Sequence, residues 1–308
     1  MSAIAATVAI AYLVSVIVNL ARLAPMQRVP PSEAMQGATP RGSGAPGASE
    51  PRSDAPPGLA LESVIRSAVA ADEAATTGVA VVLPDGSWIG GLNPELPGYA
   101  ASTFKLALLY EAERRVSEGR LGYDDRLALD EEARREDLGT LARLPIAEDG
   151  TISLGQALEA MVVVSDNASA IAVLRLLGPS QVDARLRQLG IVTMSVNDRA
   201  LPTTARDLAL LMAAIVRGEG LNTTAHTHAL DLLFAQEARA GIPAALEPYP
   251  DVIRVGNKTG TWDNATRDVA VVEAEAGTYV VAAMTEGDWN WELVGRLARA
   301  IHGELTRQ

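Results

Sequence analysis

The sequence predicts an α/β (α+β) fold in which an antiparallel sheet flanked by helices carries an inserted all-helical subdomain. Strand-like segments lie at both ends of the folded region: GVAVVL at 78–83 near its start, and two apolar strands around Ala276-Gly277 near its end. The stretch between them, from about 102 to 217, is dominated by helical periodicity. Because both ends supply sheet and the middle supplies helices, we expect a cleft between the two parts.

Each expected element has a local signal in the sequence. The run LESVIRSAVAADEA, which starts at Leu61, has helical spacing of its apolar residues. It leads into GVAVVL, a Pro84-Asp85-Gly86 turn and the short strand SWIGGL. The middle helices are expected over 104–116, 154–164, 167–177, 182–189 and 204–216, and a closing amphipathic helix over 289–305. The folded domain therefore covers 61–308.

Two further segments precede this domain. Residues 1–23 contain an uncharged, mostly apolar run, 3–21, whose length at about 1.5 Å per residue nearly spans a bilayer core of about 30 Å. The run predicts a membrane anchor helix; the alternative is a cleaved signal peptide, although no Lys or Arg precedes the run and its cleavage pattern is poor. Residues 24–60 are rich in Pro, Gly, Ala and Ser, which predicts a flexible linker.

The orientation of the anchor does not follow from charge. Arg22 and Arg28 lie after the apolar run, and the positive-inside rule favours a cytoplasmic position for them. That rule weakens for long translocated domains, so the expected location follows from the chemistry described below. We expect a single-pass protein of the cell membrane with an extracytoplasmic domain, or a secreted protein if the segment is cleaved.

Charge and composition exclude several kinds of site and partner. The net charge of −12 repels phosphate backbones, so no nucleic-acid partner is expected. The absence of Cys excludes disulfides, zinc–thiolate sites and Cys nucleophiles. His226 and His228 are two apart in a predicted helix and point to different sides, so we expect solvent-exposed side chains rather than metal ligands. With His302 as the only other His, a His-dependent triad is hard to build.

The first motif is Ser102-Thr103-Phe104-Lys105, at the start of an apolar helical run. The N-terminus of a helix favours developing negative charge, and a Lys three residues after a Ser lies on the same face. A buried, deprotonated Lys105 could therefore remove the proton of the Ser102 hydroxyl. Taken alone, a Ser in this position is more often an N-cap.

Two more motifs follow. Ser165-Asp166-Asn167 opens another helix; capping is one interpretation, and the other is a proton relay through Ser165 with Asn167 bonded to a substrate amide. Lys258-Thr259-Gly260 follows VIRVGN and precedes Thr261, which predicts the end of an edge strand along a cleft. There Lys258 supplies positive charge, Thr259 a hydroxyl for a carboxylate, and Gly260 room for a substrate. Alone, this motif could be an exposed turn.

Together, the motifs SxxK, SDN and KTG, in this order, are similar to the signature set of class A β-lactamases and penicillin-binding proteins. The resemblance spans roughly Leu61 to the C-terminus. It implies a β-lactamase/transpeptidase-like fold and a serine hydrolase of the cell envelope that acts as a monomer on a small molecule, without metal or organic cofactor.

The resemblance also assigns roles to single residues. It implies that Ser102 attacks the acyl carbonyl with Lys105 as base, that Ser165 relays a proton, and that Asn167, Lys258 and Thr259 hold the substrate. The oxyanion would lie between the backbone N–H groups of Ser102 and Thr261, with Gly260 leaving space beside them. Arg267 matches a carboxylate-binding position, although an Arg at a strand end is more often a surface ion-pair partner.

The sequence departs from class A in one loop. Class A enzymes carry a Glu between SDN and the next helix, and it activates the deacylating water. Here the segment 190–209, GIVTMSVNDRALPTTARDLA, is short and contains no Glu. Asp198 is a conceivable substitute, but a solvated loop Asp is the more common case, and Asp207 is expected to cap its own helix. We therefore expect ready acylation by β-lactam-type amides and slow hydrolysis of the acyl-enzyme.

Alternative functions remain open at this point. A penicillin-binding D,D-peptidase or an esterase would use the same residues, and the missing Glu favours it. A sensor that binds β-lactams or muropeptides without turnover fits the predicted anchor and linker. A structural domain has little support.

Overall fold

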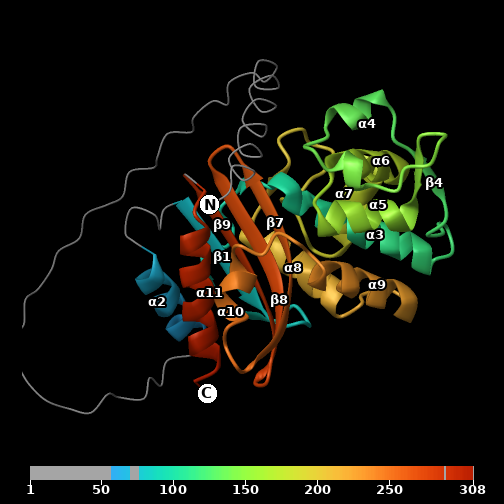
Figure 1. Ribbon diagram of the computed structural model, residues 1–308. Helices are drawn as coiled ribbons and strands as arrows, with labels where there is room; N and C mark the ends of the chain where they lie inside the picture. Colours follow the sequence, from blue (N-terminus) through green and yellow to red (C-terminus); the bar gives the residue numbers. More distant parts are fainter. Residues whose placement is uncertain (1–56, 70–75, 288, 308) are drawn as a thin grey trace, which may run out of the picture. The chain divides into compact units, whose positions relative to one another are not determined.

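The computed structural model describes residues 57–69, 76–287 and 289–307. The predicted anchor and most of the predicted linker lie outside these residues. Within the described part of the chain, no helix combines the length and the apolar character that a membrane crossing requires. Figure 1 shows the described chain as a sheet with helices on both faces and a separate cluster of helices beside it.

The sheet has five antiparallel strands in the order β2-β1-β9-β8-β7. The strands are β1 (Thr77–Val82), β2 (Trp88–Leu92), β7 (Val252–Trp262), β8 (Ala265–Ala274) and β9 (Gly277–Glu286). The first two and the last three thus come from opposite ends of the domain, as predicted from the sequence. Gly277, with φ of 133°, makes the turn between β8 and β9 that Ala276-Gly277 predicted.

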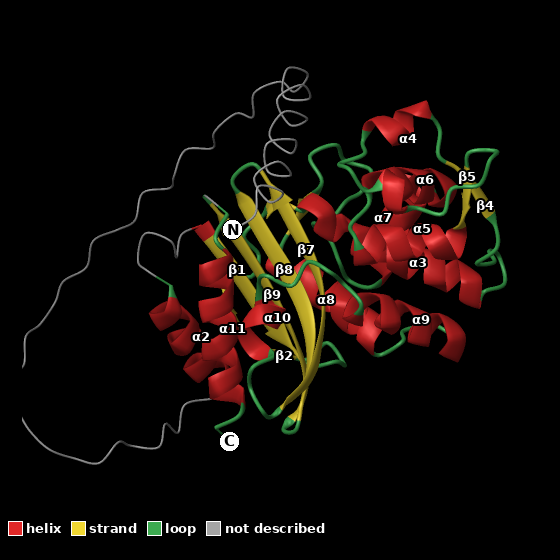
Figure 2. Cartoon of the chain, viewed as in Figure 1, coloured by secondary structure: helices red, strands yellow, loops and turns green. Residues whose placement is uncertain are grey.

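Both faces of the sheet are covered (Figure 2). Helices α2 (Pro57–Ala68), α10 (Ile242–Leu246) and α11 (Trp291–Leu305) lie on one face, and α8 (Ala205–Val216) packs on the other. Alternate residues of a strand enter different cores: Val79 and Val81 join the core under α11, whereas Ala80 and Val82 join the core shared with the helical part. A sheet buried on both faces explains why its strands are continuous apolar runs.

The inserted part is mainly helical. Its helices are α3 (Lys105–Ser117), α4 (Glu131–Arg135), α5 (Leu154–Val163), α6 (Asn167–Leu177), α7 (Pro179–Gln188) and α9 (Thr223–Phe234). Side-chain caps start several of them, including the Ser153–Gln156 capping box of α5 and the Asn222 cap of α9. This arrangement confirms the predicted helical insertion, to which the structure adds a small two-stranded antiparallel sheet of β4 (Arg126–Ala128) and β5 (Thr151–Ser153).

Two small elements join the parts at the site. Strand β3 (Gly98–Tyr99) pairs with β6 (Pro202–Thr203), and the 3₁₀ helix η2 (Ala101–Phe104) follows β3 directly. A second 3₁₀ helix, η3 (Leu141–Arg143), belongs to the helical part. The pairing of β3 with β6 brings the loop that precedes α8 next to η2.

The histidines differ from expectation. His226 and His228 are partly buried, and each has a protein partner: the Val216 carbonyl for His226 at 2.9 Å, and Glu113 Oε1 for His228 at 2.6 Å. His302 is fully buried. The prediction of solvent-exposed side chains for His226 and His228 was therefore wrong, because α9 packs on α8, which carries Val216, and on α3, which carries Glu113. Among the described residues, no cluster of His, Asp and Glu could hold a metal ion.

Candidate active site

Ser102 lies in η2, in a turn that the backbone holds under strain. The preceding residue, Ala101, has φ of 47°, which costs a non-glycine residue of order 1 kcal/mol. The Ala100 N–H donates to the Leu201 carbonyl at 2.8 Å, and Thr103 Oγ1 donates to the Ala100 carbonyl at 2.5 Å. No side chain caps η2 or α3, so Ser102 is not a simple N-cap.

Lys105 is fully buried and directed at the SDN motif. Its Nζ donates to the Ser165 carbonyl at 2.5 Å, to Ser165 Oγ at 3.2 Å and to Asn167 Oδ1 at 2.7 Å. Burial is the main cause that holds its pKa well below the usual value for Lys, and the charge of Lys258 lowers it further. The charge of Asp166 acts in the opposite direction. A Lys in this environment can be neutral, as a general base must be.

The SDN turn contains the helix cap that the sequence gave as one interpretation, and it places the Ser165 hydroxyl beside the lysines. Asp166 is the N-cap of α6, accepting from the Ser169 N–H at 2.5 Å, and it also accepts from Thr140 Oγ1 at 2.5 Å. Ser165 takes a left-handed conformation with φ of 59°. The Ser165 hydroxyl faces the lysines, while the Asp166 carboxylate beside it caps the helix.

Lys258 meets the same hydroxyl from the sheet side. Its Nζ donates to Ser165 Oγ at 2.9 Å and to the Thr259 carbonyl at 2.9 Å. Burial lowers its pKa to about 7, and the charge of Asp268 partly opposes this shift. Lys105 and Lys258 are the only two lysines in the chain, and both are fully buried at Ser165.

Gly260 allows β7 to approach the nucleophile turn. A Cβ at this position would lie 2.9 Å from Ser102 N and 3.0 Å from both the Ala100 carbonyl oxygen and Thr103 N. The space that the missing side chain leaves is therefore occupied by η2, whereas the sequence predicted room for a substrate. The same contact brings Ser102 N close to the segment that continues into Thr261, as the predicted pair of oxyanion donors requires.

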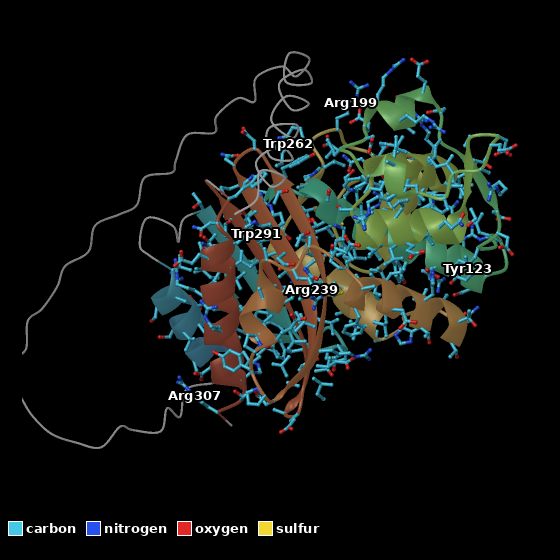
Figure 3. All side chains as sticks on the ribbon, in the orientation of Figure 1. Tyr123, Arg199, Arg239, Trp262, Trp291 and Arg307 are labelled. Carbon is cyan, nitrogen blue, oxygen red and sulfur yellow. The ribbon has the colours of Figure 1, made fainter. Side chains whose placement is uncertain are left out.

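The remaining residues of β7 extend along the site. Thr259 is almost fully buried, and Thr261 is partly exposed. Trp262 packs against Tyr99 with ring centroids 5.6 Å apart, which ties the end of β7 to β3. In Figure 3, the label Trp262 marks this end of the strand, and Arg239 is labelled farther along it. The Arg239 guanidinium donates to the Val255 carbonyl at 2.8 Å.

Arg267 lies next to Gly260 in the sheet, but its guanidinium is bonded to groups outside the three motifs. Its guanidinium is fully buried and donates to the Tyr99 carbonyl at 2.9 Å, to the Thr285 carbonyl at 2.5 Å and to Glu286 Oε1. These acceptors hold the group against β3 and β9, so in this structure it does not face a substrate carboxylate. Arg267 pairs with Gly260 across β7 and β8, so its side chain extends on the face that supports η2.

The loop without the Glu is held by two buried carboxylates. Asp183 accepts from Ser195 Oγ at 2.6 Å and from the Val196 N–H at 2.8 Å. Asp207 accepts from the Met194 N–H at 2.7 Å. The expectation that Asp207 caps its own helix was wrong: the hydroxyl of Thr204 caps α8, and the Asp207 carboxylate holds the loop instead.

Asp198, the conceivable water base, is a turn residue. Its side chain is exposed, and its Oδ1 accepts from the Ala200 N–H at 2.9 Å. Its own N–H bonds to Ser195 Oγ at 3.0 Å. This geometry fits the solvated loop interpretation.

Two supporting residues were missed from the sequence. Thr140 contacts Asp166 from a loop 26 positions earlier, and Asp183 lies on α7, away from every motif. Neither has a local signal, because an isolated Thr or Asp gives no indication of its distant partner. Asp183 and Asp207 together explain how a short loop keeps a fixed place beside η2.

Comparison with known proteins agrees with this geometry. The profile of the beta-lactamase enzyme family matches residues 60–305. Among solved structures, a beta-lactamase from Sphaerobacter thermophilus is 26% identical with a TM-score of 0.70, covering 80% of this chain and 97% of that one. PBP-A is 23% identical with a TM-score of 0.71, covering 81% and 97%. A variant of the last common ancestor of Gram-negative bacteria class A beta-lactamases is 23% identical with a TM-score of 0.70, covering 80% and 99%.

The family match covers most of the chain and includes all three motifs. The structural similarity extends over nearly the full length of each compared protein, and it confirms the predicted β-lactamase/transpeptidase-like fold. The chain therefore belongs to the beta-lactamase enzyme family and is a serine hydrolase of the β-lactamase-like kind.

Proposed function

We propose that the protein is acylated at Ser102 by β-lactam-type amides and releases the acyl group slowly. The observation that carries this proposal is the convergence of both lysines on Ser165 Oγ, within one network beside the nucleophile turn. Two buried ammonium groups at one hydroxyl repel each other. A neutral Lys105 next to a charged Lys258 removes this repulsion.

In the proposed acylation, neutral Lys105 takes the proton of the Ser102 hydroxyl while Oγ bonds to the acyl carbon. The C–N bond then breaks, and the proton reaches the leaving nitrogen through Ser165. Charged Lys258, with Thr259, holds the substrate carboxylate, and the N–H groups of Ser102 and Thr261 bind the oxyanion. Lys105 and Ser165 end the step in their initial protonation states: the acyl group is on Ser102 Oγ, and the Ser102 proton is on the leaving nitrogen.

Slow deacylation is supported by the loop before α8. Hydrolysis needs a base that activates water, and 190–209 contains no Glu. Of its two Asp residues, Asp207 is bonded to the loop backbone and Asp198 lies exposed in a turn. The acyl-enzyme would thus lack a positioned base.

The same feature supports a second candidate, a penicillin-binding D,D-peptidase or esterase on this fold. A mutant of PBP-A, which is 22% identical to this chain, was captured as an acyl-enzyme complex with penicillin-G. A D,D-peptidase would release peptide acyl groups faster than β-lactam acyl groups, so the two candidates differ in substrate rather than in machinery.

We also propose that residues 1–23 attach the domain to the cell membrane with the catalytic part outside the cytoplasm. This rests on the apolar run and on the cell-wall chemistry of the proposed substrates. Fractionation of cells that express the full chain tests it, and recovery of a processed protein from the medium would instead indicate a cleaved signal.

Covalent labelling tests the proposed function. A fluorescent penicillin should label the wild type at one site, and the Ser102→Ala variant should not be labelled. Ser63→Ala, a change at an exposed serine of α2, is the matched control and should label like the wild type. Labelling that persists in Ser102→Ala would contradict the assignment of the nucleophile.

A further inference from the structure

Asp268 is a fully buried carboxylate on β8, beside the strand that carries the KTG motif. It pairs with Thr259 in the register of β7 and β8, so it lies one position from Lys258 on strands that are about 5 Å apart. Its side chain reaches the α10 side of the sheet, where a Cβ at Gly241 would clash with Asp268 Oδ2. Lys258 reaches Ser165 from the same stretch of sheet. The candidate active site therefore has a buried acidic residue next to it that the proposed reaction does not use.

The hydrogen bonds of Asp268 fit its ionised form. Oδ1 accepts from Asn257 Nδ2 at 2.9 Å, and Oδ2 accepts from the Ile242 N–H at 2.8 Å. Asn257 Nδ2 also donates to the Ala238 carbonyl at 3.2 Å, and because a carbonyl can only accept, this bond fixes the orientation of the amide. Both carboxylate oxygens therefore face donors. Burial raises the pKa of Asp268 to about 6, which still leaves the group ionised at neutral pH.

Asp268 and Lys258 compensate each other without direct contact. Among the described residues, neither side chain forms an ion pair, and a buried charge without compensation is costly. The charge of Asp268 favours the ammonium form of Lys258, and the charge of Lys258 favours the ionised carboxylate. Two more cations lie near the pair: Arg239, which also favours the Asp268 carboxylate, and Lys105, which bonds to the same Ser165 hydroxyl as Lys258.

This indirect pairing leaves Lys258 Nζ one hydrogen for a ligand. An ammonium group has three N–H donors, and two of them bond to Ser165 Oγ and to the Thr259 carbonyl, each at 2.9 Å. A carboxylate in direct contact would occupy the third. We propose that Asp268 is a positioning residue of the acylation site: its charge keeps Lys258 an ammonium, and its place beyond contact leaves one N–H for the substrate carboxylate. This inference rests on the proposed acylation of Ser102.

The test compares a penicillin with its methyl ester, in the wild type and in Asp268→Asn. Rates of Ser102 adduct formation are measured by intact mass, and the ratio of the carboxylate compound to the ester reports the charge at Lys258. The Lys258 pKa of about 7 should fall by about one unit in the variant, because an opposite charge is lost. At pH 8 the charged fraction, and with it the ratio, should therefore fall about tenfold. A ratio within twofold of the wild type would overturn the proposal.

A second measurement at pH 5 separates the effect of charge from an effect of packing. At that pH, below the Asp268 pKa of about 6, residue 268 is mostly neutral in the wild type and fully neutral in Asp268→Asn. The ratios of the two proteins should therefore agree within twofold at pH 5. A tenfold deficit that persists there would show that Asp268 only supports the packing of the sheet, and it would overturn the positioning role.

Glu113→Gln is the matched control. Glu113 is also a fully buried carboxylate, but it bonds to Tyr123 and His228 in the helical part. The substitution removes a buried charge without touching β7 or β8, so it should leave the ratio unchanged at both pH values. A fall as large as that of Asp268→Asn would mean that any lost buried carboxylate has this effect, and the specific role of Asp268 would be overturned.

A titration without substrate separates this inference from the proposed function. With ¹⁵N-lysine labelling, the Lys258 Nζ midpoint should lie about one unit lower in Asp268→Asn than in the wild type. The coupling is reciprocal, so the Asp268 carboxyl midpoint, read with ¹³C-aspartate, should lie about one unit higher in Lys258→Met; this measurement decides the matter if Asp268→Asn does not fold. Shifted midpoints without any Ser102 adduct would contradict only the proposed acylation. Adducts with unshifted midpoints would overturn only the role of Asp268.

Discussion

At the scale of single residues, the proposed chemistry depends on two buried lysines. Lys105 and Lys258 have lost their hydration, which disfavours the charged form of each, and they share one hydroxyl. The lowered pKa of Lys105 suits a base, and that of Lys258, at about 7, allows a charged form near neutral pH. The sequence predicted these residues from their motifs, but only the fold shows that they meet at Ser165.

The lysines make a direct titration possible. With ¹⁵N-lysine labelling, the chain should give only two Nζ signals, assigned by Lys105→Met and Lys258→Met. We expect the Lys258 signal to titrate near pH 7, because the group is buried. A midpoint near the unperturbed value of about 10.4 would contradict its burial.

The same shift affects stability. Between about pH 7 and 10 the unfolded state binds the proton that folded Lys258 has lost, so Lys258 should contribute a rise of about 1 kcal/mol per pH unit to the free energy of unfolding, in addition to the rise that Lys105 contributes. Denaturant titrations at pH 7 and 9 measure this rise. In Lys258→Met the rise should be smaller, and an equal rise in both proteins would refute the assignment.

Arg267 is expected to act as a positioning residue rather than a carboxylate ligand, because its guanidinium is bonded to the backbone of β3 and β9. In Arg267→Gln the rate constant of acylation should fall about tenfold or more as the nucleophile turn shifts, while substrate binding to the Ser102→Ala form stays nearly constant. Arg254→Gln, at an exposed cross-strand pair with Glu273, is the control. A large loss of binding, restored by a substrate without carboxylate, would show the ligand role instead.

At the scale of elements, the site depends on how closely β7, η2 and the loop before α8 approach one another. Motif spacing predicted the strand at Lys258 and the helix after Ser102. It could not predict that Gly260 packs on the nucleophile turn, since the contact joins residues about 158 positions apart. The sequence also did not show that Asp207 holds a loop. An Asp three residues after Thr204 looks the same in the sequence whether its carboxylate caps the helix or accepts from a distant backbone N–H.

Gly260→Ala tests the first of these contacts. Its Cβ would lie 2.9 Å from Ser102 N, so the backbone must move, and acylation should slow by about 100-fold. The free energy of unfolding should fall by about 1–3 kcal/mol. Gly303→Ala, in α11 with no atom near the added methyl, is the control and should be neutral or slightly stabilising. Full activity of Gly260→Ala would disprove the close packing.

Asp207→Asn tests the loop. The buried carboxylate accepts hydrogen bonds from the backbone N–H groups of Met194 and Thr193. The Asn side chain has an NH₂ group in place of one carboxylate oxygen, and this group cannot accept a hydrogen bond. We expect a loss of about 1–3 kcal/mol and faster hydrogen exchange in 191–201. Asp198→Asn, at the exposed turn, should change neither quantity, and equal effects of the two variants would contradict the anchoring role.

At the scale of the whole molecule, the two ends of the domain build the sheet and the middle builds the helical part, so the site lies where they meet. This topology was predictable, because strand and helix periodicities separate along the chain. Small elements such as β3, β6 and α10 were not, since runs of two to five residues carry too little pattern. We propose that this junction holds the groups for acylation and lacks a base for deacylation.

The lifetime of the Ser102 adduct decides between slow and fast deacylation. The domain from Leu61 onward is mixed with a chromogenic cephalosporin, and product release and intact mass are followed together over time. We expect a burst of product equal to the enzyme concentration, then an adduct on Ser102 that persists long after the burst. Continuous turnover without an accumulating adduct, unchanged in Asp198→Asn and abolished in Ser102→Ala, would show that the protein activates water by another route.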